Sequence, residues 1–408
     1  MEQIVKNALE RVEREQGGDD TPSSRGTDDD QELMEVLERA RARILVVGVG
    51  GAGNNTATRL KEEGIGGAEV IAINTDAQDL VSCKADRKVL IGYELTRGLG
   101  AGGDPRVGEE AAKEDIEKIK EVVEGADMVF VTCGLGGGTG TGAAPVIAEV
   151  TRKEEGALTI GVVTLPFSVE GRRRIENALE GLERLRQVAD TCIVIPNDRL
   201  LEIVPDLPIA AAFKVADEVL INAVKGITEM ITRPGLMNLD FADVRAVMEN
   251  GGFALIGIGE AENDSESGNR AVQAVENALN NPLVDVEVSG ATGALVNIVG
   301  GKDLTLKEAE EVVELVASEL SEDATVIWGA QIDEDLNDVL RVTVIVTGIE
   351  DADLEAMFTG PKQPKRAEVK EMTAESSRPE KVPEVSKGGA ESPEGEKPSS
   401  LEDLEKIL

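Results

Sequence analysis

Hydrophobic and polar positions divide the central part of the chain into two patterns. In the first, short β-branched runs alternate with helical stretches; the runs are Ile44 to Val47, Val70 to Ile73, Met128 to Thr132, Leu158 to Thr164 and Cys192 to Ile195. This alternation predicts a doubly wound parallel sheet, a fold that binds ligands at the carboxyl ends of its strands. The first part of the chain is therefore expected to be an α/β domain.

The second pattern follows a long predicted helix, from about Ile209 to Thr232, which Arg233-Pro234-Gly235 ends. Helices are predicted near Asn269 to Asn280 and Leu306 to Leu320. The predicted strands are Ala254 to Ile258, Val284 to Val288, Ala294 to Val299, Ala324 to Trp328 and Val342 to Val346. Because strands dominate, we expect a smaller α+β domain, joined to the first by the central helix.

The two ends of the chain have other patterns. A charged extension occupies residues 1–40, and the residues before 400 are rich in Pro, Glu, Lys and Ser, which predicts a disordered linker. The last eight residues, LEDLEKIL, regain helical apolar spacing and form either a peptide that folds in a partner's groove or a solvated tail. The predicted segments are 1–40, 41–232, 233–350, 351–400 and 401–408.

Composition excludes several classes of function. The chain has 79 acidic and 42 basic residues, a formal charge of −37, which disfavours binding to nucleic acid or to an anionic membrane surface. No stretch approaches the ~20 apolar residues of a membrane span, so no direct membrane insertion is expected. The three cysteines are far apart and indicate a reducing, cytoplasmic compartment.

The absence of histidine removes whole mechanisms. Ser-His-Asp triads, Cys-His pairs and His-ligated zinc are excluded, and no Cys cluster is present to hold a metal. Catalysis must therefore use carboxylates, backbone amides, lysine, arginine or a bound cation.

The first candidate site follows the first strand. Gly48, Gly50 and Gly53 fit the dinucleotide fingerprint G-x-G-x-x-G, and Asn74 and Asp76 follow the next strand, where a ribose ligand would lie. Glycines there let phosphates approach backbone N–H groups. This motif alone leaves open a nucleotide site, a nicotinamide or flavin site, or a purely structural turn.

A second glycine-rich loop, Gly134 to Gly142, follows the strand at Met128, with a helix expected to begin near Ala143. Its glycines free successive amides to converge on an anion, and Thr139 and Thr141 offer hydroxyls. A dinucleotide enzyme has no obvious use for this loop, and it lacks the Gly-Lys-Ser/Thr of a Walker A motif. The two loops together favour a phosphate-binding site of another kind.

The residues at this point resemble a known family. Gly136 to Gly142, GGGTGTG, is identical to the signature loop of tubulin and FtsZ, and Gly48 to Asn55, GVGGAGNN, is similar to the first nucleotide loop of FtsZ. Further ordered matches extend over roughly Arg43 to Gly348, including Pro234 to Arg245. The chain looks closer to FtsZ than to eukaryotic tubulin, and its composition would suit an archaeal member.

The resemblance implies a fold and a set of nucleotide-binding residues. The fold is a doubly wound parallel-sheet GTPase domain, joined by the central helix to a smaller α+β domain. Phosphate contacts are implied along the glycine loops, ribose contacts at Glu170 with Arg174 beside the nucleotide, and base contacts at Asp217, Asn55 and Phe213. The complete set is Gly51, Ala52, Gly53, Asn54, Asn55, Gly100, Gly102, Gly103, Gly138, Thr139, Gly140, Thr141, Gly142, Glu170, Arg174, Phe213 and Asp217.

Simpler interpretations of these residues remain open. Glu170 and Arg174, four residues apart, suit a surface helix pair, and Phe213 suits a plain core position.

An ionised carboxylate only accepts hydrogen bonds, so Asp217 suits the N–H edge of guanine better than adenine, which favours GTP and GDP over ATP.

Three residues are candidates for catalysis: Asn238, Asp240 and Asp243. Hydrolysis of a phosphoanhydride needs an oriented water and charge compensation, usually with Mg²⁺, and two carboxylates can polarise the water. The simpler alternative is a capping box, with Asp240 as N-cap and Asp243 as its partner. The resemblance implies that this segment reaches the γ-phosphate of a neighbouring subunit, so both roles can hold together.

The function implied is that of a cell-division GTPase that polymerises head to tail into filaments forming a ring at midcell. Its partners would be further copies of itself and division proteins that bind the C-terminal tail, although LEDLEKIL lacks the proline and terminal basic residue common in bacterial tails. Two alternatives are a GTP-binding cytoskeletal scaffold with another role and a dinucleotide-dependent oxidoreductase.

Overall fold

The computed structural model describes residues 42–203, 208–233, 239–263, 269–281, 283, 288–333, 336 and 338–349. The predicted N-terminal extension, linker and C-terminal peptide lie outside these residues, and so does Asn238. Among the described helices, none is both long and apolar enough to cross a membrane.

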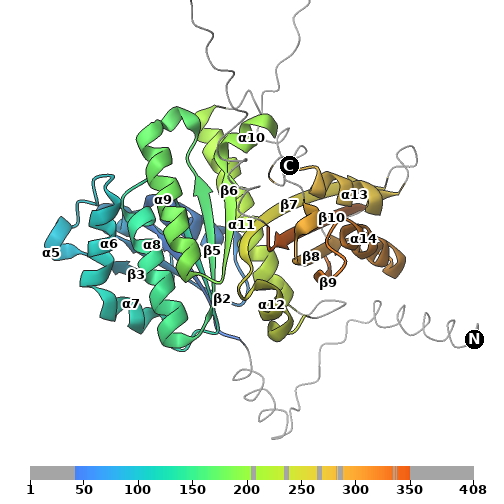
Figure 1. The fold of residues 1–408 in the computed structure, drawn as a ribbon, viewed down its shortest axis with the longest axis horizontal. Helices are drawn as coiled ribbons and strands as arrows, with labels where there is room; N and C mark the ends of the chain where they lie inside the picture. The colour runs from blue at the N-terminus through green and yellow to red at the C-terminus, as the bar shows by residue number, and fades with distance from the viewer. Residues whose placement is uncertain are drawn as a thin grey trace, which may run out of the picture. The chain divides into compact units, whose positions relative to one another are not determined.

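The described strands form one ten-stranded sheet in the order β3-β2-β1-β4-β5-β6-β7-β10-β8-β9 (Figure 1). The strands are β1 (Ile44–Val49), β2 (Ala68–Asn74), β3 (Arg87–Leu90), β4 (Met128–Gly134), β5 (Leu158–Leu165), β6 (Thr191–Pro196), β7 (Gly252–Glu262), β8 (Gly293–Gly300), β9 (Thr325–Ile332) and β10 (Val339–Thr347).

The first seven strands in sheet order, β3-β2-β1-β4-β5-β6-β7, pair in parallel with their neighbours. This confirms the predicted doubly wound sheet. Strand order reverses between β1 and β4, because the chain goes outward from β1 to β2 and β3 and then returns to β4. This switch point is where doubly wound folds bind ligands. Strand β10 is antiparallel to both β7 and β8, so the second part of the sheet is mixed.

Helices cover both faces of the sheet. They are α3 (Gly50–Glu63), α4 (Ala77–Ser82), α5 (Tyr93–Thr96), α6 (Pro105–Glu114), α7 (Ile116–Val123), α8 (Thr139–Val150), α9 (Arg172–Val188), α10 (Asn197–Ile203), α11 (Ile209–Thr232), α12 (Phe241–Met248), α13 (Arg270–Leu279) and α14 (Leu306–Ser318). Alternate residues of β1 point into two separate cores, one shared with α3 and α11 and the other with α6 to α9.

The central helix α11 begins and ends at the predicted residues, Ile209 and Thr232. It packs against β5 and β6 and also against β8 and β9, so it joins the two parts of the sheet as well as the two sequence patterns (Figure 1). Strand β7 pairs directly with β6, which makes the sheet continuous across residue 233. The domain boundary proposed there stays a prediction.

Two sequence predictions need correction, and one strand was missed. Val288 lies in a 3-10 turn (Val288–Gly290) and not in a strand, while residues 284–287 lie outside the described part. Strand β3 was not predicted, since it is short and includes the charged Arg87 and Lys88. Helix α8 begins at Thr139 and not near Ala143, because its glycine-rich first turn packs on α6.

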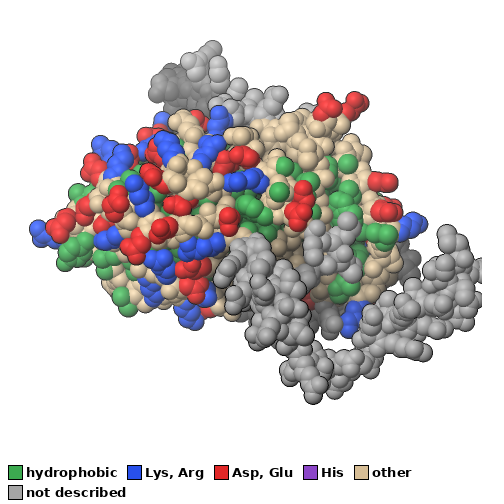
Figure 2. Space-filling view, turned by 90° about the horizontal axis from the view of Figure 1, so that it is seen from below, with side chains coloured by type: hydrophobic (Ala, Val, Ile, Leu, Met, Phe, Trp, Pro, Cys, Tyr) green, Lys and Arg blue, Asp and Glu red, His purple; other side chains and the backbone are tan. Residues whose placement is uncertain are grey.

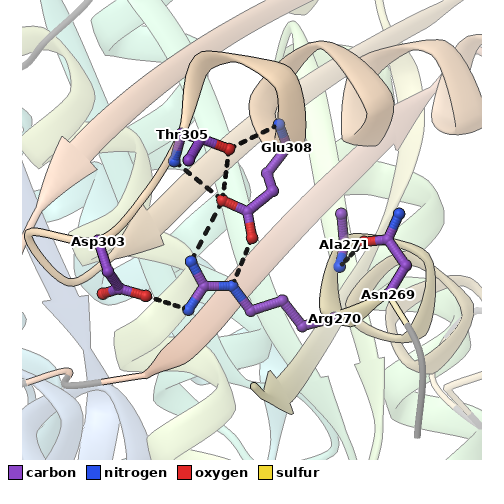
Figure 3. A network of polar contacts seen from close by, with 6 residues as sticks. All are labelled: Asn269, Arg270, Ala271, Asp303, Thr305 and Glu308. Carbon is purple, nitrogen blue, oxygen red and sulfur yellow. Dashed lines mark hydrogen bonds and ion pairs between the residues drawn. The ribbon is translucent and has the colours of Figure 1, made fainter. Parts of the chain in front are cut away.

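In the second part of the sheet, a buried ion network joins α13 to α14 (Figure 3). The Arg270 side chain is 3% exposed and donates from Nε and Nη2 to the two carboxylate oxygens of Glu308, at 2.7 and 3.2 Å, and also pairs with Asp303. Glu308 and Thr305 form a capping box at the start of α14. The bidentate pair therefore fixes the layer that covers β7 and β10.

The acidic excess does not form a single charged face in the view from below. There, acidic and basic side chains intermingle over the parallel part of the sheet and its helices (Figure 2).

Candidate functional site

The two glycine loops meet at the switch point, because they follow the neighbouring strands β1 and β4. Gly50 has φ +72°, and a Cβ there would lie 2.8 Å from the Gly140 nitrogen; a Cβ on Gly140 would lie 3.2 Å from the Val49 carbonyl oxygen. Backbone therefore contacts backbone: Gly50 requires glycine, and a side chain at Gly140 would force its neighbours to shift.

Glycines also explain why α8 begins early. A Cβ on Gly142 would lie 1.9 Å from the Pro105 carbonyl oxygen, so the first turn of α8 needs a glycine at this position to pack on α6. Sequence reasoning placed these glycines in a loop because glycine is a poor helix former, yet tertiary packing puts them in the helix.

Both helices present open N-termini. Neither α3 nor α8 has an acidic residue in its first turn or a side-chain cap, whereas α4 and α6 are capped by the carboxylates of Asp76 and Asp104. The first N–H groups of a helix lack partners within it, and its dipole favours negative charge there. The two uncapped ends together form a cradle suited to phosphate groups.

A cavity of about 300 Å³ opens at these helix ends and gathers residues that are distant in sequence. Among the predicted site residues, those that line it are Gly51, Ala52, Gly103, Gly138, Thr139, Gly140, Glu170, Arg174, Phe213 and Asp217. The cavity thus contains the implied phosphate, ribose and base ends of the site.

The cavity also has lining residues that are not in the predicted set of nucleotide contacts, although some belong to the predicted loops: Val49, Ala101, Gly134, Leu135, Gly137, Thr164, Pro166, Asn197 and Ala216. A signal for two of them existed. Thr164 lies at the end of β5 and Asn197 directly follows β6, and the carboxyl ends of neighbouring parallel strands share one edge of a sheet.

Several predicted residues lie behind the cavity wall. A Cβ on Gly53 would meet the Thr132 carbonyl oxygen at 2.5 Å, so this glycine serves packing of α3 on β4. The Thr141 hydroxyl is buried and accepts a hydrogen bond from the Gly136 nitrogen at 2.8 Å, which shapes the loop from within. Asn54 is 1% exposed and donates to Asp79.

Three others border the site without lining the cavity. Asn55 is exposed on α3. Gly100 and Gly102 have φ of +84° and +61° and belong to the same turn as Ala101 and Gly103, which do line the cavity. Their positive φ angles favour glycine, so this turn follows a path that other residues rarely adopt.

One end of the cavity has an aromatic wall. The rings of Phe213 and Phe167 meet edge to face, with centroids 5.2 Å apart, and Phe213 remains 42% exposed. The core interpretation of Phe213 is therefore wrong. Its open position leaves ring surface available to stack on a flat base.

Asp217 lies at the same end of the cavity as Phe213, on the same helix, α11. Burial raises the pKa of its carboxyl from 3.8 to about 6, and the nearby Arg59, whose Nε lies 3.8 Å from Oδ2, opposes that shift. The carboxylate carries an unrelieved desolvation cost, which adjacent N–H donors on a bound base would offset.

Glu170 and Arg174 both line the cavity and form the ion pair that their spacing suggests. The Glu170 Oε1 atom also accepts a hydrogen bond from the Phe167 nitrogen at 2.9 Å. The pair is therefore part of the cavity rim and not a remote surface contact.

The candidate catalytic carboxylates lie at the opposite edge of the sheet. On α12, Arg245 donates from Nη2 to the Gly156 carbonyl oxygen at 2.6 Å, just before β5 begins, whereas the cavity lies where β5 ends (Figure 1). The eight residues of β5 span roughly 26 Å at about 3.3 Å each. Asp240 and Asp243 start α12 and do not line the cavity.

The capping-box interpretation of these two residues is wrong. Asp240 does occupy the N-cap position of α12, but its side chain makes no capping hydrogen bond. Both aspartates are exposed. The side-chain oxygen of an N-cap residue usually accepts a hydrogen bond from a backbone N–H group of the helix. Because Asp240 makes no such bond, its carboxylate is free for another task.

Comparisons with known proteins agree with this geometry. Residues 43–205 match the model of the Tubulin/FtsZ family, GTPase domain, and residues 252–350 match that of the FtsZ family, C-terminal domain. The chain is 61% identical to cell division protein FtsZ 1 of Methanocaldococcus jannaschii, over 83% of this chain and 91% of the relative. It is 59% identical to the Archaeoglobus fulgidus protein of the same name, over 86% and 94%.

Solved structures show the same fold. A dimer of M. jannaschii FtsZ without ligand superposes with a TM-score of 0.74 at 61% identity and covers 80% of this chain and 93% of that one. CetZ2 of Haloferax volcanii, in a protofilament with GTPγS bound, superposes with a TM-score of 0.68 at 26% identity and covers 78% and 96%.

Proposed function

Since the chain belongs to the FtsZ family of cell-division GTPases, we propose that it binds GTP in the glycine-loop cavity and hydrolyses it with Asp240 and Asp243 of a second copy. The observation that carries this proposal is the separation of roughly 26 Å between the cavity and α12 along β5. One chain holds both parts of the site but cannot bring them together.

The cavity would bind the nucleotide through features already described. Uncapped amides of α3 and α8 would hold the phosphates, Glu170 would contact the ribose with Arg174 beside the nucleotide, and the base would lie against Phe213. Asp217 would accept hydrogen bonds from the N–H edge of guanine, which gives the preference for GTP over ATP.

Hydrolysis would require head-to-tail contact between copies. The exposed carboxylates of Asp240 and Asp243 from one copy would polarise a water in line with the γ-phosphate held by the next. Such a contact uses different surfaces on the two copies, so it propagates into a filament unless it closes on itself. Assembly and turnover are thereby coupled.

Mg²⁺ is proposed as a companion of the nucleotide. The described residues contain no group of three or more acidic or cysteine side chains that could hold a metal. Mg²⁺ commonly takes most of its ligands from phosphate oxygens and water, which suits a cradle built of amides and hydroxyls. When bound, it would offset phosphate charge.

In the cell we propose assembly in the cytoplasm at the division site, with division proteins attached through residues 401–408. The oxidoreductase alternative is set aside, because the GTPase match spans residues 43–205 and both glycine loops line one cavity.

Phosphate release from GTP, measured across a protein concentration series beside pelleting of polymer and with ATP as control, tests the proposal. We expect specific activity near zero below a threshold concentration and a rise with pelletable polymer, with GTP only. Activity per molecule that stays constant on dilution would mean that the site is complete within one chain.

A further inference from the structure

Asp79 lies in the first turn of α4 and holds two buried amides. Its Oδ2 atom accepts hydrogen bonds from Nδ2 of Asn54, at 2.7 Å, and from Nδ2 of Asn74, at 2.6 Å. Asn54 belongs to α3 and Asn74 ends β2, so one carboxylate oxygen joins two elements of the site. Asp79 itself lies outside the cavity lining.

This carboxylate determines how the Asn74 amide is turned. Because Nδ2 points at Asp79, Oδ1 faces the backbone and accepts from the nitrogens of Thr75, at 2.8 Å, and Asp76, at 3.3 Å. Asn54 and Asn74 are 1% and 3% exposed, so without Asp79 their Nδ2 groups would be desolvated without an acceptor. The cost would favour a rearrangement of the backbone at Thr75.

From Thr75 the network reaches the cavity by two routes. The Thr75 hydroxyl shares a 2.7 Å hydrogen bond with that of Thr139, which lines the cavity at the start of α8. The Thr75 carbonyl oxygen accepts from the Gly100 nitrogen at 3.2 Å and so holds the turn that includes Ala101 and Gly103. Two segments around the phosphate cradle, the start of α8 and this turn, therefore depend on one short stretch of backbone.

The simpler interpretation is that Asp79 is an acid in the first turn of a helix, where it interacts with the helix dipole. That role would leave its side chain in solvent. Here the α4 cap fixes its backbone, since the Asp76 carboxylate accepts from the Asp79 nitrogen at 3.2 Å, and its carboxylate turns inward to the two amides. The dipole alone does not explain this geometry.

We infer that Asp79 is a positioning residue for the nucleotide site: it orders the cradle through Asn54, Asn74 and Thr75 and does not contact the nucleotide. This inference rests on the proposed function of the cavity. It predicts that loss of the Asp79 acceptor weakens nucleotide binding from outside the cavity wall.

The test is calorimetric titration of the full chain with GDP, together with thermal melting of each variant. Asp79→Ala removes the acceptor and is expected to weaken GDP binding about tenfold. Asp79→Asn can place an oxygen at the same position and is expected to stay within about threefold of the unsubstituted chain. Thr75→Val cuts the link to Thr139 alone and is expected to weaken binding several-fold, which covers the case of a misfolded Asp79→Ala.

Asp86→Ala is the matched control. Asp86 likewise joins β2 and α3, since it accepts a hydrogen bond from the Val70 nitrogen at 2.9 Å and pairs with Lys61, but none of its hydrogen bonds or ion pairs involves Asn54, Asn74 or Thr75. Its loss should lower the melting temperature and leave GDP affinity within about twofold. GDP binding by Asp79→Ala at unsubstituted affinity, or equal weakening in Asp86→Ala, would overturn the inference alone. Failure of the unsubstituted chain to bind GDP would overturn the proposed cavity and the inference with it.

Discussion

The two edges of the parallel sheet differ in how firmly the chain itself holds the side chains that the proposed site would use. At the carboxyl edge, the hydroxyls of Thr75, Thr139 and Thr141 are hydrogen-bonded and glycine backbones touch, so contacts within the chain hold the cavity wall. At the amino edge, Asp240 and Asp243 are exposed and α12 lacks a side-chain cap.

The difference separates binding from chemistry within one chain. A preformed cradle loses little conformational entropy when the nucleotide binds. The exposed carboxylates stay solvated until a second copy approaches, so their desolvation does not destabilise the single chain. Substitutions at the amino edge should therefore change turnover alone, and those at the carboxyl edge should change binding or folding.

The largest expected effect is that of Asp243→Ala on turnover. Loss of a group that polarises the attacking water should lower GTP hydrolysis about a hundredfold or more. GDP affinity of the monomer should stay unchanged, because α12 lies near the start of β5 and the cavity lies at the end of that strand, which is roughly 26 Å long. Phosphate release at a concentration that gives polymer, beside GDP titration at a low concentration, measures both.

Glu249→Ala is the control for that substitution, since Glu249 is an exposed acid at the other end of α12. Its turnover should match that of the unsubstituted chain. Unchanged turnover in Asp243→Ala, or GDP binding that falls along with turnover, would remove the distinction between the two edges.

The next effect concerns folding at the carboxyl edge. Gly142→Ala places a Cβ 1.9 Å from the Pro105 carbonyl oxygen and should lower the free energy of unfolding by about 2–3 kcal/mol. Gly51→Ala meets no atom within 4 Å and should melt like the unsubstituted chain, yet bind GDP more weakly because its methyl group enters the cradle. Equal melting temperatures for the two variants would contradict the packing argument.

The sequence predicts those parts of this arrangement that depend on local pattern. Helix α11 was located to the residue because its apolar positions repeat at helical spacing and Pro234 follows its end. The core strands were found because their β-branched runs are buried on both faces. Strand β3 was missed, since its edge position tolerates Arg87 and Lys88.

The parts that escaped prediction depend on contacts between distant residues. Nothing near Gly142 in sequence shows that Pro105 lies against it, and nothing near Asp79 shows that Asn54 and Asn74 point to it. The position of Asn197 after a predicted strand was a signal, but its place in the cavity follows from the pairing of β6 with β5. Strand pairing and side-chain packing join residues that are far apart in the sequence, so no short stretch of sequence predicts them.

The smallest expected effect sharpens the comparison at the base end of the cavity. Burial raises the pKa of Asp217 to about 6 in the folded chain from its ordinary value of 3.8, so the folded chain binds this proton more tightly. The carboxyl therefore contributes stability below about pH 4 that is lost as the pH rises to about 6. Asp217→Asn avoids this loss. It should raise the free energy of unfolding by about 1–2 kcal/mol at pH 8 without nucleotide.

The same substitution should weaken GDP binding, because guanine needs an acceptor-only carboxylate there. In the unsubstituted chain, GDP affinity should decline as the pH falls below about 6, while in Asp217→Asn it should be flat across that range. Melting at pH 4 and pH 8 and GDP titration at pH 5 and pH 8 separate the two effects. A stability gain that is equal at both pH values would assign it to packing, and a pH-dependent affinity in Asp217→Asn would place the titrating group elsewhere. The expected pattern instead means that the carboxyl edge sacrifices some folding stability to keep one charged acceptor ready for the base.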